Sequence, residues 1–349
     1  MKFNKFFTCF LATSLLVASC KDDDFDFNNQ ETSYSGILVS NEGKYGTPSG
    51  SVDFIASDLS ATKSDIYKLA NNEDLGDVFQ SIGFKGTNAY LVINNSNKIV
   101  VANRFTFQKN TVISSNLVNP RYIAFTESQF YVTNNNFDDV KRLNIYNNAD
   151  NTFIKSINFD RYAEKVVEAG GNIVVQTDGT GYDGNWNELP TGHTLTIVKP
   201  TTNTIDKVVT LPDAGIIKDL VTYEGSAYAL SSTDTDSYIY KINPTNGSFT
   251  TITLTGIANV QKLRIDSGNF YFLDLANKVY SKTISSTSNA KTLFTATGST
   301  YGFDVIDGRI FVSNASFTGE STSYVYNAST GAQIKSFKSG IATNGFYKN

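Results

Sequence analysis

Seven short segments of the chain share one pattern of apolar and polar positions. Each is apolar or aromatic over most of its length and ends close to a small polar side chain, as in "ILVSN" and "FYVTN". Segments this short and this rich in β-branched and aromatic residues favour strands over helices. We therefore expect seven buried strands, each closed by a side chain that can hydrogen-bond the following turn. The seven segments recur 40–54 residues apart and end at Asn41, Asn94, Asn134, Thr177, Ser231, Asp274 and Asn314.

A second apolar segment follows each of these, for example "RLNIYN" (142–147). Turn residues come next, as in "NPTNG" (243–247), and then a third segment such as "IDKVVTL" (205–211). A further strand, such as "RYIAF" (121–125), precedes most units. Four antiparallel strands repeated seven times, with hardly any helical pattern, predict an all-β fold, a seven-bladed β-propeller. A β-sandwich does not fit, because it needs about seven strands in roughly 100 residues.

The two ends of the repeat complement each other. The first unit begins at "GILVSN" (36–41) without a preceding innermost strand. The last unit is followed by "GIATNGFYKN" (340–349), which matches the segment that leads into the third unit. We expect residues 343–348 to form the innermost strand of the blade whose other three strands come from residues 36–69. This pairing would close the ring without an open sheet edge, so the propeller domain would span residues 34–349.

The first nineteen residues lie outside the repeat. Lys2 and Lys5 precede an apolar stretch of about a dozen residues, which is typical of a signal peptide and too short to span a bilayer. The stretch ends at "VASC" (17–20), which resembles the lipobox of bacterial lipoproteins and implies lipidation of Cys20. "KDDD" (21–24) resembles the export signal of Bacteroidetes surface lipoproteins, although a solvated tether has the same composition.

These signals predict three segments: a lipoprotein signal peptide over residues 1–19, a lipidated flexible tether over 20–33 and the propeller. The expected location is the outer membrane, on the cell surface, with the lipid as the only membrane attachment. Cys9 would leave with the signal peptide and Cys20 would carry the lipid, so the folded part would have no disulfide.

Composition narrows the chemistry. The net charge is −4, and charged residues make up only 18% of the chain, which argues against a nucleic-acid partner. With one His and no cysteine in the folded part, a His/Cys zinc site and a Cys–His nucleophile are excluded. We therefore assign no metal, no cofactor and no catalytic residue.

The repeat resembles the YncE-like propellers found in Bacteroidetes surface lipoproteins, and the resemblance covers essentially all of residues 34–349. Some of these relatives capture ligands on top of a TonB-dependent outer-membrane transporter. The resemblance therefore implies a small-molecule ligand and such a transporter as a partner. The fold itself carries no activity, so the function must be argued from a site.

Propeller ligands usually bind at the end of the central channel where the innermost strands start and where the second strand of each blade joins the third. Four positively charged side chains at innermost-strand starts would focus positive potential there in a slightly acidic protein. The predicted ligand-binding residues are Arg121, Tyr122, Lys165, Lys218, Lys262 and Tyr301 at strand starts, with Tyr45, Phe137, Tyr182, Asp183, Trp186 and Phe317 in the loops.

The longest of these loops, residues 176–193, holds both the only Trp and the only His of the chain. Loops longer than about 12–15 residues are commonly functional or disordered. Trp186 and Tyr182 would offer flat apolar faces with a polar tip; alternatively, Trp186 packs into its own loop or the neighbouring blade. His193 is expected to hydrogen-bond a turn. A calcium loop is not supported, because Glu188 stands where the loop requires glycine.

Three functions fit the sequence. The favoured one is a non-enzymatic surface lipoprotein that captures a nutrient, cofactor or metal complex for the transporter. A protein–protein scaffold in a surface complex is the first alternative. The second is a cation-dependent propeller lactonase or lyase, which would need acidic side chains converging at the channel mouth; the innermost strand starts offer only Glu164 and Asp219.

Overall fold

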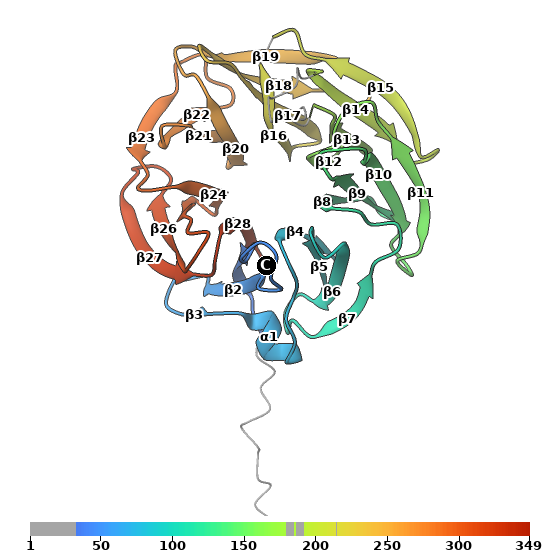
Figure 1. The fold of residues 1–349 in the computed structure, drawn as a ribbon. Helices are drawn as coiled ribbons and strands as arrows, with labels where there is room; N and C mark the ends of the chain where they lie inside the picture. Colours follow the sequence, from blue (N-terminus) through green and yellow to red (C-terminus); the bar gives the residue numbers. More distant parts are fainter. Residues whose placement is uncertain (1–32, 179–184, 186–191, 214) are drawn as a thin grey trace, which may run out of the picture. The chain divides into compact units, whose positions relative to one another are not determined.

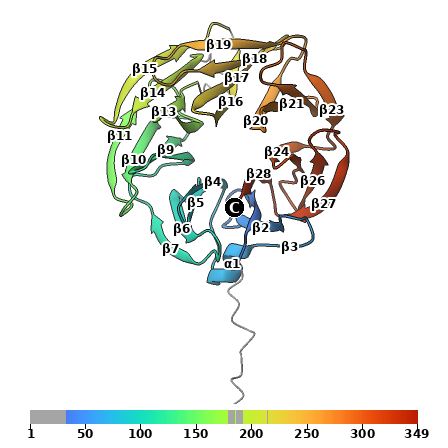
Figure 2. The same ribbon diagram turned by 180° about the vertical axis from the view of Figure 1, so that it is seen from behind.

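The computed structural model describes residues 33–178, 185, 192–213 and 215–349. These residues form seven four-stranded antiparallel sheets, which Figure 1 shows as blades around a common centre and Figure 2 shows from behind. The all-β seven-bladed propeller predicted from the sequence is confirmed. The predictions on residues 1–32, with Cys20 among them, and on Tyr182, Asp183 and Trp186 lie outside the described residues.

We number the blades in chain order and give the strands of each blade from the innermost to the outermost. Blade 1 contains β28 (Thr343–Lys348), β1 (Gly36–Asn41), β2 (Ser51–Ala56) and β3 (Thr62–Lys63). Blade 2 contains β4 (Phe79–Lys85), β5 (Asn88–Ile93), β6 (Lys98–Asn103) and β7 (Lys109–Ile113). Blade 3 contains β8 (Pro120–Phe125), β9 (Gln129–Asn135), β10 (Lys141–Asn147) and β11 (Phe153–Asn158).

The remaining four blades follow the same order. Blade 4 contains β12 (Val166–Ala169), β13 (Asn172–Gln176), β14 (Thr194–Lys199) and β15 (Thr204–Thr210). Blade 5 contains β16 (Ile216–Tyr223), β17 (Ser226–Ser232), β18 (Ser237–Ile242) and β19 (Phe249–Leu254). Blade 6 contains β20 (Val260–Asp266), β21 (Asn269–Asp274), β22 (Lys278–Thr283) and β23 (Lys291–Thr295). Blade 7 contains β24 (Thr300–Ile306), β25 (Arg309–Asn314), β26 (Ser321–Asn327) and β27 (Gln333–Ser339).

The C-terminal strand closes the ring as predicted. β28 pairs antiparallel with β1, with Ile37 opposite Lys348 and Val39 opposite Phe346. Beyond the strand, the backbone N–H of Asn349 donates to the carbonyl of Gly36 at 2.8 Å. One blade is therefore built from both ends of the propeller sequence, so opening the ring requires breaking a sheet.

One short helix departs from the strand pattern. The outer strand of blade 1 is only β3, and the chain then forms α1 (Ile66–Asn71), whose Ile66 and Tyr67 are buried in the core shared with blade 2. The Asp65 side chain accepts a hydrogen bond from the Lys68 backbone N–H at 3.3 Å. A helix of six residues depends on tertiary packing more than on propensity, so the sequence pattern alone does not reveal it.

The cores lie between neighbouring blades. Strands such as β5 and β9 are buried along nearly their whole length, because other blades cover both of their faces. Tyr90 of blade 2, for example, packs on Phe130 of blade 3, and Phe130 stacks on Tyr146 with ring centroids 4.8 Å apart. Outer strands such as β11 keep several residues exposed. This arrangement explains why the inner segments carry continuous apolar runs.

The polar residues near the ends of the seven repeated segments make hydrogen bonds within their own blade or to the next blade. Asp274 accepts a hydrogen bond from Lys278 N in the following turn at 2.9 Å, as predicted. The Asn94 side chain instead donates to the Pro120 carbonyl of the next blade at 3.0 Å. Asn134 and Asn314 accept backbone N–H groups from the segments leading into their own blades. At Asn94, Asn134 and Asn314 the side chains thus bond segments other than the following turn, a role that was not predicted.

Candidate functional site

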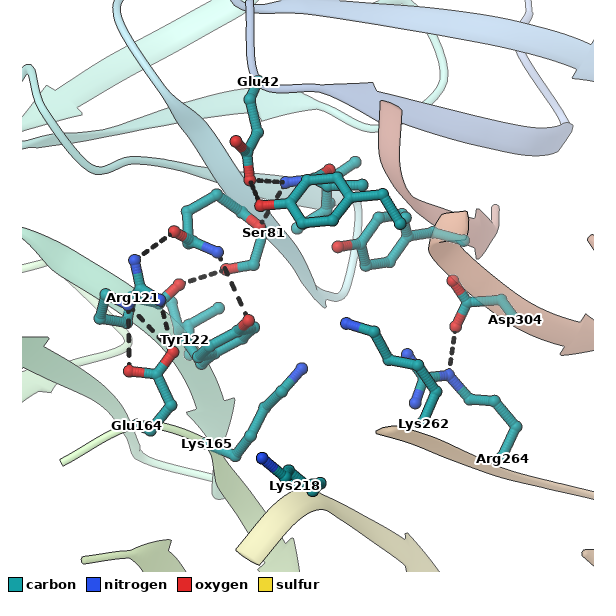
Figure 3. A pocket seen from close by; sticks show the side chains of 17 residues that line it. Glu42, Ser81, Arg121, Tyr122, Glu164, Lys165, Lys218, Lys262, Arg264 and Asp304 are labelled. Atoms are coloured by element: carbon teal, nitrogen blue, oxygen red, sulfur yellow. Dashed lines mark hydrogen bonds and ion pairs between the residues drawn. The ribbon is translucent and has the colours of Figure 1, made fainter. Parts of the chain in front are cut away.

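A cavity of about 340 Å³ lies at the centre of the ring, at the end where the innermost strands begin. Every blade contributes to its wall, and most of the lining side chains are polar or charged (Figure 3). It is lined by Glu42, Gln80, Ser81, Ile82, Arg121, Tyr122, Ile123, Glu164, Lys165, Lys218, Lys262, Arg264, Tyr301, Asp304, Asn344, Gly345 and Tyr347.

Two hollows on the outside of the propeller, of about 410 and 550 Å³, are larger. They are lined mainly by turn residues, among them Pro48 and Ser128, and an ion pair in one of them, Lys68–Asp74, is more than half exposed. Charges in such positions are well solvated and interact weakly. We therefore take the central cavity as the candidate site, because it gathers charged groups that are shielded from water.

β-Bulges turn several of the lining side chains toward the centre. The pairing of the innermost strand with its neighbour shifts register near the start of β4, β8, β16, β20 and β24. A bulge leaves a residue outside the ladder and re-aims its side chain. At Tyr122 the freed backbone N–H donates to Thr133 Oγ1 at 3.1 Å, which keeps the bulge satisfied. The cavity-lining residues at these shifts are Gln80, Arg121, Tyr122, Lys218 and Tyr301.

Arg121 is held rigidly on one side of the cavity. Its Nε donates to both carboxylate oxygens of Glu164 at 3.1 Å, and its Nη1 donates to Gln80 Oε1 at 2.7 Å. Paired N–H groups on one carboxylate combine charge with a fixed geometry. Most of the charge of Arg121 is therefore already compensated by Glu164.

A second network joins three blades around Asp219, a side chain only 1% exposed. Its Oδ2 accepts from Arg264 Nη1 at 2.7 Å and from the Leu263 backbone N–H at 3.0 Å. Arg264 Nε also donates to Asp304. Burial alone would raise the pKa of Asp219, but Arg264 and Lys165 outweigh it and lower that pKa to about 2. Asp219 is thus a buried anion that organises the surrounding cations.

Three lysines face the cavity from adjacent blades. Lys165 Nζ lies 3.7 Å from Asp219 and 3.9 Å from the ring centre of Tyr122, a cation–π contact. Lys218 and Lys262 have no carboxylate within 4 Å among the described residues. Burial, together with the nearby charge of Lys165, lowers the pKa of Lys262 to about 8. In Figure 3 the side chains of Lys165 and Lys262 extend toward the middle of the cavity.

Glu42 contributes from blade 1. Its Oε1 accepts from the Tyr301 hydroxyl at 2.8 Å and from Asn344 Nδ2 at 3.1 Å, while its Oε2 has no hydrogen-bond partner among the described residues. Burial raises the pKa of Glu42. The cavity is therefore asymmetric, with lysines in blades 5 and 6 that have no carboxylate partner in the described part of the chain and a hydrogen-bonded carboxylate in blade 1.

The predicted site residues separate into two groups. Tyr45, Phe137 and Phe317 do not line the cavity and are 78%, 44% and 53% exposed. Phe137 lies under Arg121 and Phe317 packs on Tyr301, so both still contact the cavity wall from outside. Those that line the cavity are Arg121, Tyr122, Lys165, Lys218, Lys262 and Tyr301.

Among the charged and aromatic side chains that line the cavity, sequence reasoning missed Glu42, Arg264, Asp304 and Tyr347. Arg264 follows Lys262 by two positions, and alternate residues of a strand face the same side. Arg264 could have been predicted by following every second residue along each innermost strand from its start. Glu42 was missed because it stands at the end of a second strand, directly after the apolar segment, and not at an innermost start.

His193 has the local role expected for it. Its Nδ1 lies 2.6 Å from the carbonyl of Gly215, and its backbone N–H donates to Asp178 at 2.6 Å. Within the described part of the chain, no three His, Cys, Asp or Glu side chains are close enough together to hold a metal ion. In that part, too, no helix is long and apolar enough to cross a membrane.

A protein-family model described as a domain of unknown function, DUF5074, matches residues 35–347. The chain belongs to this family. The match spans the whole ring, from the first residues of blade 1 to its closing strand, so this DUF5074 domain is one complete propeller. No curated protein matches the sequence.

Several solved structures share the fold of this DUF5074 protein. The computationally designed Ika8 protein superposes with a TM-score of 0.60 at 10% identity, covering 90% of each chain. Hydrazine synthase of Kuenenia stuttgartiensis has a TM-score of 0.58 at 11% identity, and the alignment covers 74% of this chain and 86% of the hydrazine synthase chain. Dihydro-heme d1 dehydrogenase NirN, in complex with DHE, has a TM-score of 0.57 at 11% identity. The alignment covers 92% of this chain and 76% of the NirN chain. At such identities the likeness extends to the fold alone.

Proposed function

We propose that this protein is a lipid-anchored surface protein of the outer membrane that captures a small ligand in the central cavity and passes it to a TonB-dependent transporter. The observation that carries the proposal is the cavity, where all seven blades bring charged and hydrogen-bonding side chains around about 340 Å³. That volume is in the range of small-molecule sites, which also concentrate a few convergent polar groups. Binding without chemistry is the activity that this arrangement supports best.

The chain topology is compatible with anchoring through Cys20. β1 starts at Gly36, whose carbonyl accepts from Asn349 just beyond the end of the innermost strand β28. The cavity lies at the opposite end, where the innermost strands begin. The chain therefore enters β1 from the end of the propeller away from the cavity.

Exposed apolar side chains support a contact with a partner protein at the cavity end of the propeller. Tyr45, Phe137, Leu275 and Phe317 lie in loops between second and third strands, at the same end of the propeller as the cavity. Large exposed apolar residues that gather on one face are characteristic of contact surfaces. We define these four residues as the apolar rim and propose that the transporter contacts it. The rim equally supports the alternative function, a scaffold that binds a protein partner without a ligand.

The cation-dependent lactonase or lyase has less support. Such an enzyme needs free carboxylates converging on one point. Glu164 is held by Arg121, and Asp219 and Asp304 are both held by Arg264. These side chains act as counter-ions to arginines, and their oxygens are engaged elsewhere.

Capture can be tested by a thermal-shift screen of the mature protein in detergent against a library of small metabolites. A ligand at about 100 times its Kd should stabilise the fold by about 2.7 kcal/mol and raise the Tm by roughly 5 °C. Tyr122→Ala, which removes a cavity wall, should abolish that shift. Val208→Ala, on the exposed outer strand β15, is the control and should preserve it. A library without a stabilising member, or equal shifts in both variants, would contradict capture in the cavity.

A further inference from the structure

The lysines that line the cavity bear on which chemical class of ligand is captured. Lys165 immediately precedes β12, Lys218 lies in β16 and Lys262 in β20, so three adjacent blades each place one ammonium group on the same side of the cavity. We define these three residues as the lysine wall. Given the proposed function, on which this inference rests, we propose that the ligand is a small organic anion whose carboxylate or phosphate group binds the lysine wall.

The nearby carboxylates neutralise this wall only in part, because Lys165 alone of the three lysines has one within 4 Å among the described residues. Asp219 accepts its short contact from Arg264, at 2.7 Å, and stands 3.7 Å from Lys165. Lys218 and Lys262 have no carboxylate within 4 Å in the part of the chain that the structure describes. Partly buried cations without a counter-ion are unfavourable, and a bound anion would remove that cost.

Burial, and after it neighbouring positive charge, disfavours the charged form of Lys262. Burial and the proximity of Lys165 lower its pKa to about 8, although Asp219 and Asp304 act in the opposite direction. An arriving oxyanion would face several N–H donors on partly buried side chains, whose charges are screened less than those of fully exposed groups. Charge-assisted hydrogen bonds of this kind are the stronger ones in proteins.

Glu42 sets a second requirement for the chemical groups of the ligand. Its Oε2 is an acceptor without a partner among the described residues, and its carboxylate would repel a second negative group. A ligand that fills the cavity should therefore direct its acid group to the lysine wall and a hydroxyl or amine donor to Glu42. Hydroxylated acids and sugar phosphates combine both features, whereas neutral sugars lack the first.

Isothermal titration of the mature protein at constant ionic strength can separate these ligands. The panel consists of hydroxylated carboxylates and sugar phosphates, gluconate and glucose 6-phosphate among them, with glucose as the uncharged counterpart. We expect at least one acid to bind one-to-one and at least tenfold more tightly than glucose. Binding of gluconate but not of glucose 6-phosphate would identify a carboxylate site, and the reverse a phosphate site.

Single substitutions in the lysine wall provide the decisive comparison. Lys218→Met and Lys262→Met should each weaken the best acid roughly ten- to hundredfold, the loss expected for a hydrogen bond to a charged group. Lys155→Met, on the exposed strand β11, changes the net charge equally and should leave the affinity unchanged. Equal affinities in all three variants would overturn the inference.

The outcomes also separate this inference from capture itself. If the screen finds a neutral ligand that requires Tyr122, capture stands and the anion inference fails. If no ligand of any charge binds, capture fails and the anion inference fails with it.

The affinity for such an acid should also depend on pH. An anion stabilises protonated Lys262 and so raises its pKa in the complex; affinity is therefore full below about pH 8 and falls as the pH rises above it. Titrations between pH 6 and pH 10, at constant ionic strength, should show this decline in the wild type and a smaller one in Lys262→Met. A flat profile in the wild type would contradict a contact with Lys262. The charged and titratable groups around Lys262 are Glu42, Lys165, Lys218, Asp219, Arg264, Tyr301 and Asp304.

Discussion

Deletion of residues 343–349 should abolish the cooperative folding of the propeller. Without β28, the inner edge of β1 loses its hydrogen-bonded partner, and Phe346 no longer packs against Phe311 of blade 7. Losing a buried Phe alone typically costs 3–5 kcal/mol, and the open sheet edge adds to this loss. Since domains are stable by only about 5–15 kcal/mol, we expect the truncated chain to lose its single sharp transition in circular dichroism melts.

Phe346→Ala keeps the strand and removes only its main apolar contact, so it serves as the graded comparison. This variant should still melt in one transition, at a lower temperature than the wild type. A truncated protein that melts like the wild type would show that the ring does not depend on its closing strand.

Asp219→Asn should be the most damaging single substitution in the charged network beside the cavity. The change preserves the shape of the side chain but removes the anion that Arg264 and Lys165 surround. Breaking a buried ion pair by removing one partner costs about 3–5 kcal/mol; here Lys165 loses its carboxylate and Arg264 keeps only Asp304. Urea unfolding should show this loss directly. Asp307→Asn removes the exposed pair with Lys348 and should cost less than about 1 kcal/mol.

The same carboxylate predicts how stability changes with acid. The folded-state pKa of Asp219 is lowered to about 2, below the value of about 3.9 for an unfolded Asp. Its contribution is therefore complete above about pH 4 and is lost as the pH falls through about 2. Between pH 4 and pH 2, wild-type stability should consequently fall more steeply than that of Asp219→Asn. Parallel slopes would contradict an ionised, stabilising Asp219.

The ring could be predicted from the sequence because each blade repeats one pattern. Buried inner segments, turns such as "NPTNG" and the unmatched ends each reflect a local rule, and the pairing of β1 with β28 follows from counting strands. The helix α1 could not be predicted in this way. Ile66 and Tyr67 are buried against neighbouring blades, and a packing contact between distant segments leaves no periodic signal in six residues.

The site was only partly predictable. The positions of Lys165, Lys218 and Lys262 follow from where the innermost strands start, so their convergence could be anticipated. The ion pairs around these lysines could not be anticipated, because they depend on which carboxylates Arg264 contacts. Arg264 forms ion pairs with both Asp219 and Asp304. Lys218 and Lys262 consequently have no carboxylate partner among the described residues. The β-bulges, which aim Tyr122 and its neighbours, likewise appear only in the strand register.

The two ends of the propeller lie close enough together to be joined. Asn349 donates a hydrogen bond from its side chain to the carbonyl of Tyr34 at 2.6 Å, and adjacent termini are the condition under which circular permutation is tolerated. A permuted gene with a short linker between these residues could begin in the exposed loop between β17 and β18. Blade 1 would then be continuous in the sequence and blade 5 would be the divided one.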